Sequence, residues 1–226
     1  MAFESSDSGT QKHRHRKQVV RTLLAERDME AIEDWIVNER SPLRPLSSLL
    51  FDNEELIRWR AIEALGKAAA HEWRRDPERV RRQIRSFFWL MNDESGGICW
   101  NAPEAIAEIL YNIPELIDEY GLQLPSFFVE EPFEYGSRWA VARLSKKDNS
   151  SFVSAASDLA TSLKEGDGAI RGMSLLALTA MGSAAARTEA ASLTEDDHPV
   201  TIYNFDTGNF DMSTVGELAR NYLNAI

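Results

Sequence analysis

Apolar residues recur along most of the chain at the three- and four-residue spacing of one helix face. The pattern is clearest between residues 54 and 70, where Ile57, Ala61, Ala64, Leu65 and Ala68 fall on one side of an alanine-rich segment. Comparable stripes predict further helices over residues 19–24, 29–36, 77–91, 102–112, 133–147, 152–163 and 170–181. We therefore predict an all-α fold.

Residues 195–226 break this pattern. Val200 and Ile202 alternate with polar neighbours as in a β-strand, and residues 206–209 offer a turn. Thr214 and Glu217 have capping-box spacing before a last helical stripe. We predict a small hairpin and a helix that cap the end of the helical array. The expected organisation is a flexible tail over 1–16, a helical part over 17–194 and this C-terminal unit over 195–226.

The helical part contains a repeat. One position of the repeat holds residues 58, 99, 138 and 171, which lie 41, 39 and 33 residues apart and are Arg, Cys, Arg and Arg. The next position holds Trp59, Trp100, Trp139 and Gly172. These intervals are close to the ~40-residue unit of two-helix solenoid repeats, the last one being short.

The repeat resembles the HEAT-repeat proteins, in particular short bacterial repeats of the phycobilisome-lyase HEAT-like type. Their unit has an aspartate, an arginine six residues later, small alanines and a closing glycine, which Asp52, Arg58, Ala61, Ala64 and Gly66 match. Later units depart from it, since a cysteine replaces the arginine at 99 and a proline stands at the acidic position 132. The resemblance covers about residues 42–191 and implies an α-solenoid in which such arginines pair with aspartates of their own or neighbouring repeats.

Three tryptophans at one repeat position would lie in a row on successive parallel helices. Either they form a partly exposed aromatic strip on the concave face, where solenoids bind partners, or they fill space beside the alanines. Glu63 and Glu104 stand four residues after a tryptophan, so each carboxylate shares a helix face with an aromatic ring. Such a pair can hold a cation, an amine or a partner's arginine, or form salt bridges with Arg138 or Arg143 across repeats. The candidate partner-binding residues are Trp59, Glu63, Trp100, Asn101, Glu104, Arg138, Trp139 and Arg171.

The repeat between residues 92 and 110 is irregular. Pro103 falls where the repeat places mid-helix, so the helix is expected to begin late, with Asn101 as N-cap and Glu104 closing a capping box. Ser95, Gly96 and Gly97 then form a loop before it. Free amide groups at this helix start could bind a carboxylate or small anion. The alternative is a plain structural turn.

Composition excludes several classes of function. The 226-residue chain carries 36 acidic and 25 basic residues, a net charge of −11 that opposes binding to nucleic acid. Its one cysteine, Cys99, allows neither an internal disulfide nor a cysteine-based metal cluster, and we expect it to be buried and inert. No signal peptide or membrane span is evident, so we expect a cytoplasmic protein without a cofactor or metal.

Three functions compete. The first is a non-catalytic scaffold that binds a protein or peptide on its concave, tryptophan-lined face. The second, implied by the resemblance alone, is a HEAT-like enzyme similar to bilin lyases or DNA glycosylases, although no catalytic constellation is visible. The third is a small-ligand sensor at the Gly96–Gly97 loop and the helix start near Asn101.

Overall fold

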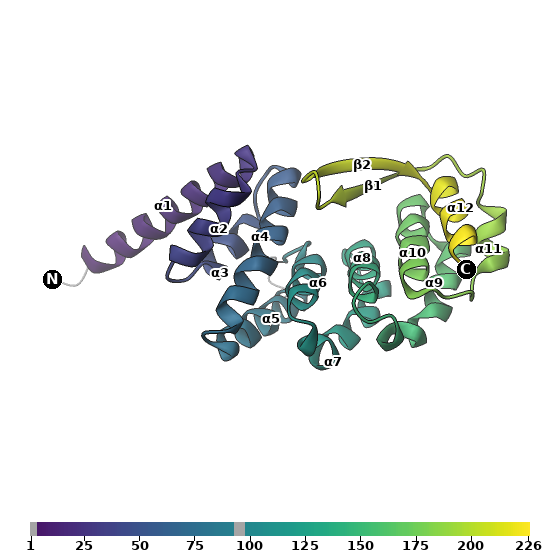
Figure 1. The fold of residues 1–226 in the computed structure, drawn as a ribbon, viewed down its shortest axis with the longest axis horizontal. Coiled ribbons are helices and arrows are strands. Elements are labelled where there is room, and N and C mark those ends of the chain that lie inside the picture. Colours follow the sequence, from purple (N-terminus) through teal and green to yellow (C-terminus); the bar gives the residue numbers. More distant parts are fainter. Residues whose placement is uncertain (1–3, 93–97) are drawn as a thin grey trace.

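The computed structural model describes residues 4–92 and 98–226, which form mostly helices and one two-stranded hairpin (Figure 1). The first helices are α1 (Glu4–Glu26), α2 (Met29–Asn38), α3 (Leu43–Leu49), α4 (Glu55–Trp73), α5 (Pro77–Met91), α6 (Ala102–Asn112) and α7 (Ile117–Tyr120). They are followed by α8 (Glu134–Ser145), α9 (Ala156–Glu165), α10 (Gly168–Met181), α11 (Arg187–Ser192), β1 (Pro199–Asn204), β2 (Asn209–Thr214) and α12 (Val215–Ala225). Short 3-10 helices span Pro114–Leu116, Gly121–Val129 and Ser150–Ala155.

Helices α4, α6, α8 and α10 lie side by side in sequence order and form a row through the molecule (Figure 1). Their contact faces carry small residues, so the helices approach closely. A Cβ added at Gly66 of α4 would meet Glu108 of α6, and one added at Gly136 of α8 would meet the carboxylate of Glu104 of α6. Helix α5 packs on α4 and α6, the 3-10 helix Gly121–Val129 on α6 and α8, and α9 on α10. The row is thus backed by a second set of helices.

The hairpin lies over this row instead of capping its end. Strands β1 and β2 pair antiparallel from Pro199↔Thr214 to Asn204↔Asn209. From its base beside α10 and α12, the hairpin extends back toward α4 and the end of α1 (Figure 1). Helix α12 packs on α10 and α11 and covers the C-terminal end of the row. The predicted capping role therefore belongs to α12, whereas the hairpin reaches the first helices.

Local sequence signals set several element ends. Asp28 accepts a hydrogen bond from the Ala31 amide at the start of α2, and Asp76 accepts one from Arg79 at the start of α5. The capping box at the start of α12 is formed in both directions between Thr214 and Glu217.

The N-terminus differs from the prediction. Helix α1 begins at Glu4, so the segment expected as a flexible tail over 1–16 is helical from there on, while residues 1–3 lie outside the described residues. Contacts hold the last part of this segment in place. Arg16 pairs with Glu39 at 3.4 Å, and the ammonium group of the adjacent Lys17 donates to the Ser48 carbonyl at 3.0 Å. The polar composition of this segment gave no sign of these contacts.

Candidate ligand pocket beneath the C-terminal hairpin

The three aligned tryptophans are not an exposed row. Trp59 and Trp139 are 3% and 5% exposed, and their rings meet edge to face with centroids 4.9 Å apart. Tyr203 of β1 stacks on Trp59 at 5.3 Å, and Phe205, just beyond the strand, stacks on Trp139 at 6.1 Å. Trp100, by contrast, is 69% exposed. The prediction of an aromatic strip is wrong for Trp59 and Trp139, because the hairpin covers them.

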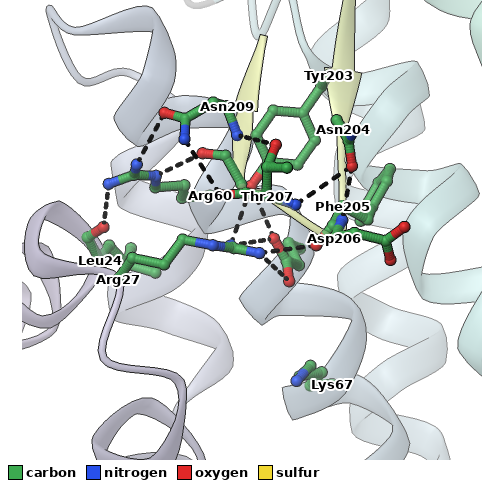
Figure 2. A network of polar contacts seen from close by, with 12 residues as sticks. Leu24, Arg27, Arg60, Lys67, Tyr203, Asn204, Phe205, Asp206, Thr207 and Asn209 are labelled. Atoms are coloured by element: carbon green, nitrogen blue, oxygen red, sulfur yellow. Dashed lines mark hydrogen bonds and ion pairs between the residues drawn. The ribbon is translucent and has the colours of Figure 1, made fainter. Parts of the chain in front are cut away.

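Glu63 anchors the hairpin to the first helices. Its Oε2 accepts from Arg27 Nη1 and from the Tyr203 hydroxyl, both at 2.7 Å (Figure 2). The second guanidinium nitrogen of Arg27 donates to the Phe205 carbonyl at 2.7 Å. Burial, followed by the adjacent Glu63 carboxylate, raises the pKa of Tyr203 above its ordinary value. Glu63 was predicted to bind a partner or to pair with Arg138 or Arg143, but it holds the protein's own C-terminal segment.

Arg60 of α4 contacts both the hairpin turn and the end of α1. Its Nε donates to the Gly208 carbonyl at 2.9 Å, and its Nη1 donates to the Leu24 carbonyl at 2.8 Å (Figure 2). Gly208 has φ +62°, and any side chain there would collide with the guanidinium of Arg27. The turn of the hairpin is therefore held between the end of α1 and helix α4.

The arginines at positions 58, 138 and 171 each contact other segments of the chain. Arg58 Nη1 donates to the Asp52 backbone carbonyl at 2.9 Å, and its Nε donates to Asn101 Oδ1 at 3.2 Å. The Asp52 carboxylate instead pairs with Arg21, 2.8 Å from its Nε. Asp52 thus connects two helices, with its carboxylate facing α1 and its carbonyl facing α4.

Arg138 and Arg171 are engaged within the fold. Arg138 donates to the Ser162 and Ser174 hydroxyls at 2.7 and 3.2 Å and to two backbone carbonyls. It is buried, and this desolvation lowers its pKa. Arg171 Nη2 donates to Asp196 Oδ2 at 2.7 Å, which fixes the segment before the hairpin. Arg138, predicted as one of the partner-binding residues, instead packs α8 against α9 and α10.

The irregular repeat begins its helix late, as predicted. Helix α6 starts at Ala102 with Asn101 as N-cap residue, but the Asn101 side chain does not cap the helix. Its oxygen accepts from Arg58, and its amide nitrogen donates to Glu104 Oε1 over 3.4 Å. The expected capping box is therefore wrong, because Arg58 takes the oxygen that would have made it. The predicted loop residues Ser95, Gly96 and Gly97 lie outside the described residues.

Glu104 is a buried carboxyl with one unused oxygen. It is 3% exposed, it lies against Gly136, and Oε2 has no hydrogen-bond partner among the described residues. Burial raises the pKa of Glu104 to about 7; Asn101 and Arg58 oppose the shift, and Glu55 adds to it. A carboxyl in this state holds a proton at mildly acidic pH and can ionise near neutrality.

Glu104 lines a pocket of about 350 Å³ between the inner helices and the hairpin. Helix α8 contributes Tyr135, whose hydroxyl donates to the Thr201 carbonyl at 2.8 Å and thereby ties the hairpin to the pocket wall. Burial raises the pKa of Tyr135. The described residues that line it are Glu55, Trp59, Asn101, Glu104, Tyr135, Ala169, Pro199, Val200, Thr201 and Phe210. Three predicted residues, Trp59, Asn101 and Glu104, are thus brought together, whereas Glu63, Arg138, Trp139 and Arg171 have the packing and anchoring roles described above.

The pocket is suited to binding through charge and aromatic contact. Among the described residues, two carboxyl groups and three aromatic rings line it, with no histidine or cysteine. Burial raises the pKa of the nearby Cys99 to about 12, so this thiol is not a nucleophile at neutral pH. In the part of the chain that the structure describes, no cluster of histidine, cysteine and acidic residues could hold a metal ion.

Several residues of the pocket and its cover were not identified from the sequence. They are Tyr135, Tyr203 and Phe210, with Arg27 and Arg60 as anchors. A usable signal was present, because the predicted hairpin region carries Tyr203, Phe205 and Phe210 within eight positions. Three aromatic residues in so short a hairpin indicate a face that packs against something.

Comparisons with known proteins identify no family. No family model and no solved structure matches the chain. A protein of Archaeoglobus fulgidus described as uncharacterized is 37% identical over 75 residues, which are 33% of this chain and 38% of that protein. The chain therefore matches well under half of that relative's length. Among residues 4–92 and 98–226, no helix has the length and apolar character needed to span a membrane.

Proposed function

We propose that this protein is an α-solenoid of HEAT-like repeats whose concave face, closed by its own hairpin, holds a small ligand. Three features support the architecture: the side-by-side order of α4, α6, α8 and α10, the helices that back them, and arginines at one repeat position that reach into neighbouring units. The protein acts as a non-catalytic ligand-binding protein. The proposal takes the concave binding face from the scaffold hypothesis and the small ligand from the sensor hypothesis. It places the ligand in the pocket and not at the helix start near Asn101.

One observation carries the functional proposal. A buried carboxyl group, that of Glu104, and three aromatic rings line a cavity large enough for a small molecule. A cavity with apolar and aromatic walls and a few converging polar groups is typical of a ligand-binding site.

A thermal-shift screen of small metabolites tests the proposal. A ligand at a hundred times its dissociation constant adds ~2.7 kcal/mol to the free energy of unfolding, which raises the Tm of a chain of this size by about 5–10 °C. Ala169→Phe is the matched control, because it fills the pocket from α10 and leaves every charge in place. We expect that the ligand does not raise the Tm of this variant. The proposal that the pocket binds a ligand would be refuted if no compound raised the Tm, or if a compound raised it equally in both proteins.

A protein or peptide partner is the second candidate, and the exposure of Trp100 favours it. This ring stands at the start of α6, outside the hairpin's cover. Trp89 of α5 is 65% exposed and serves as a control. A partner recognised at this surface is lost on Trp100→Ala and retained on Trp89→Ala, and equal retention by both variants rejects the site.

A further inference from the structure

A second pocket, near the N-terminus, carries a charge opposite to that of the whole molecule. It has a volume of about 250 Å³ and lies between one face of α1 and the start of α3. The described residues that line it are Lys12, His13, Arg16, Ser41, Arg44 and Pro45. Three of them are cationic side chains and none is acidic, in a chain of net charge −11. A cleft lined by charges of one sign concentrates ions of the opposite sign.

Two separate segments of the chain form this pocket. Lys12 and Arg16 are four residues apart on α1, so both side chains lie on one helix face. Helices α2 and α3 pack on α1 (Figure 1), and this packing brings Arg44 of α3 to the same face. Arg14 lies on another face of α1, where it is exposed and does not line the pocket. The pocket thus depends on helix packing and not only on a basic run of sequence.

The cations of this pocket repel one another. Burial, followed by the charges of Arg44, Lys17 and Arg16, lowers the pKa of His13. The charged groups that face His13 from α3 and from its own helix are therefore all positive. Arg16 pairs with Glu39 over 3.4 Å, and this carboxylate does not line the pocket. An anion that enters the pocket gains from several cations at once and relieves their repulsion.

The donors of the pocket suit a phosphate group. The guanidinium groups of Arg16 and Arg44 carry forked N–H donors, and Lys12 adds an ammonium group. A phosphate monoester has three strong acceptor oxygens and a charge of about −1.5 to −2 at neutral pH, so it can accept from several sides. Since one water takes ~30 Å³ of liquid, a volume of about 250 Å³ fits roughly eight non-hydrogen atoms. This space holds a phosphate group and a short remainder.

The surroundings of the pocket favour a small ligand over a polymer. The neighbouring helix α2 exposes Glu30, Glu33 and Asp34, and the chain as a whole is acidic. Salt screens charges beyond ~8 Å at physiological ionic strength, so a small ligand inside the pocket responds mainly to the lining. A nucleic acid or an anionic membrane extends well beyond this distance and meets the acidic surface.

We infer that the pocket between α1 and α3 binds a small molecule that carries a phosphate group, a phosphate monoester or a diphosphate, held by Lys12, Arg16 and Arg44. The Ser41 hydroxyl is placed to donate a further hydrogen bond to a phosphate oxygen. Binding is non-covalent, and no bond of the ligand changes. This site shares no residue with the pocket beneath the hairpin, so each of the two proposals can fail without the other.

Titration calorimetry of the full chain at physiological ionic strength tests the inference with pyrophosphate, ethyl phosphate, ethanol and malonate. We expect the two phosphates to bind, whereas ethanol lacks the phosphate group and malonate carries two planar carboxylates instead. Arg44→Gln should weaken pyrophosphate binding about tenfold, as expected for the loss of a hydrogen bond to a charged group. Arg14→Gln removes the same charge from the other face of α1 and should bind like the wild type. Circular dichroism establishes that both variants are folded.

Proton NMR near neutral pH locates the bound phosphate. The ring resonance of His13, assigned by its absence in His13→Gln, should shift when pyrophosphate is added, whereas that of His198 should stay in place. A shift of His198 alone would place the ligand elsewhere and overturn the inference.

Four calorimetric outcomes also overturn the inference. If neither phosphate binds, the pocket is not a phosphate site. Equal weakening in Arg44→Gln and Arg14→Gln would show a general attraction of anions to α1. Malonate that binds as tightly as ethyl phosphate would refute the phosphate class. A short DNA duplex or phosphatidate vesicles that bind more tightly than pyrophosphate would show that the basic groups serve a polyanion and not a small ligand.

Discussion

Replacing Glu104 by glutamine should stabilise the protein at neutral and alkaline pH. In the unfolded chain the glutamate ionises with its ordinary pKa of 4.5, whereas burial raises its pKa in the folded protein to about 7. The folded state thus binds the proton more tightly than the unfolded state. Stability attributable to this group is complete below pH 4.5, falls as the pH rises from 4.5 to about 7, and stays low above that.

The magnitude follows from the size of the shift. One pKa unit corresponds to ~1.4 kcal/mol, so the difference between 4.5 and about 7 amounts to about 3 kcal/mol. Glutamine is nearly isosteric and uncharged at every pH, and it can keep the weak contact with Asn101 through its carbonyl oxygen. We expect the two proteins to be about equally stable near pH 4.5. Above pH 8 the variant should be more stable by about 3 kcal/mol.

Urea denaturation followed by circular dichroism between pH 4.5 and 8.5 measures this difference. Other titrating groups, including the buried Glu108 beside Arg143, act equally in both proteins and cancel in the comparison. The difference in unfolding free energy should grow with pH up to about 7 and then level off. A difference that is constant over the whole range would show that Glu104 is ionised throughout in the folded protein, and the account of its burial would be wrong.

Three further predictions concern the hairpin and the cysteine. Tyr203→Phe removes a buried hydrogen bond to the Glu63 carboxylate and should lower the unfolding free energy by about 1–3 kcal/mol; no change in the urea midpoint would contradict the anchoring role. Gly208→Ala places a side chain at φ +62° against Arg27, and we expect a loss of at least ~1 kcal/mol, with faster amide hydrogen exchange at the hairpin turn. Cys99 should resist Ellman's reagent at pH 8 until urea unfolds the chain, whereas prompt reaction of the native protein would show that it is accessible.

Much of the secondary structure could be predicted because its signals are local. Asp76 followed by Pro77 marks the start of α5, and Thr214 with Glu217 marks the start of α12, within a few residues of the contacts they make. The late start of α6 followed from Pro103 alone. These features depend on backbone rules that hold in any tertiary context.

The candidate site could be predicted only in part, because contacts between distant segments decide which of its side chains are buried and which are exposed. Trp59 carries no local mark that distinguishes a buried ring from an exposed one, and it is buried by Tyr203 and Phe210 from the far end of the chain. The pairing of an aromatic ring with Glu104 was expected from a spacing of four residues. The ring that shares its pocket is Trp59 of the preceding helix, since Trp100 stays outside.

The hydrogen bonds between the hairpin and the first helices also affect how the chain folds. In an open array each unit touches only its neighbours, so end units can fray separately and unfolding can proceed in steps. Here Arg27 and Arg60 bind carbonyls 178 and 148 positions later in the sequence, which joins the first helices to the C-terminal hairpin. Neither end can detach without breaking bonds at the other. Forming such distant contacts slows folding. We expect the first helices and the hairpin to unfold together instead of in separate steps.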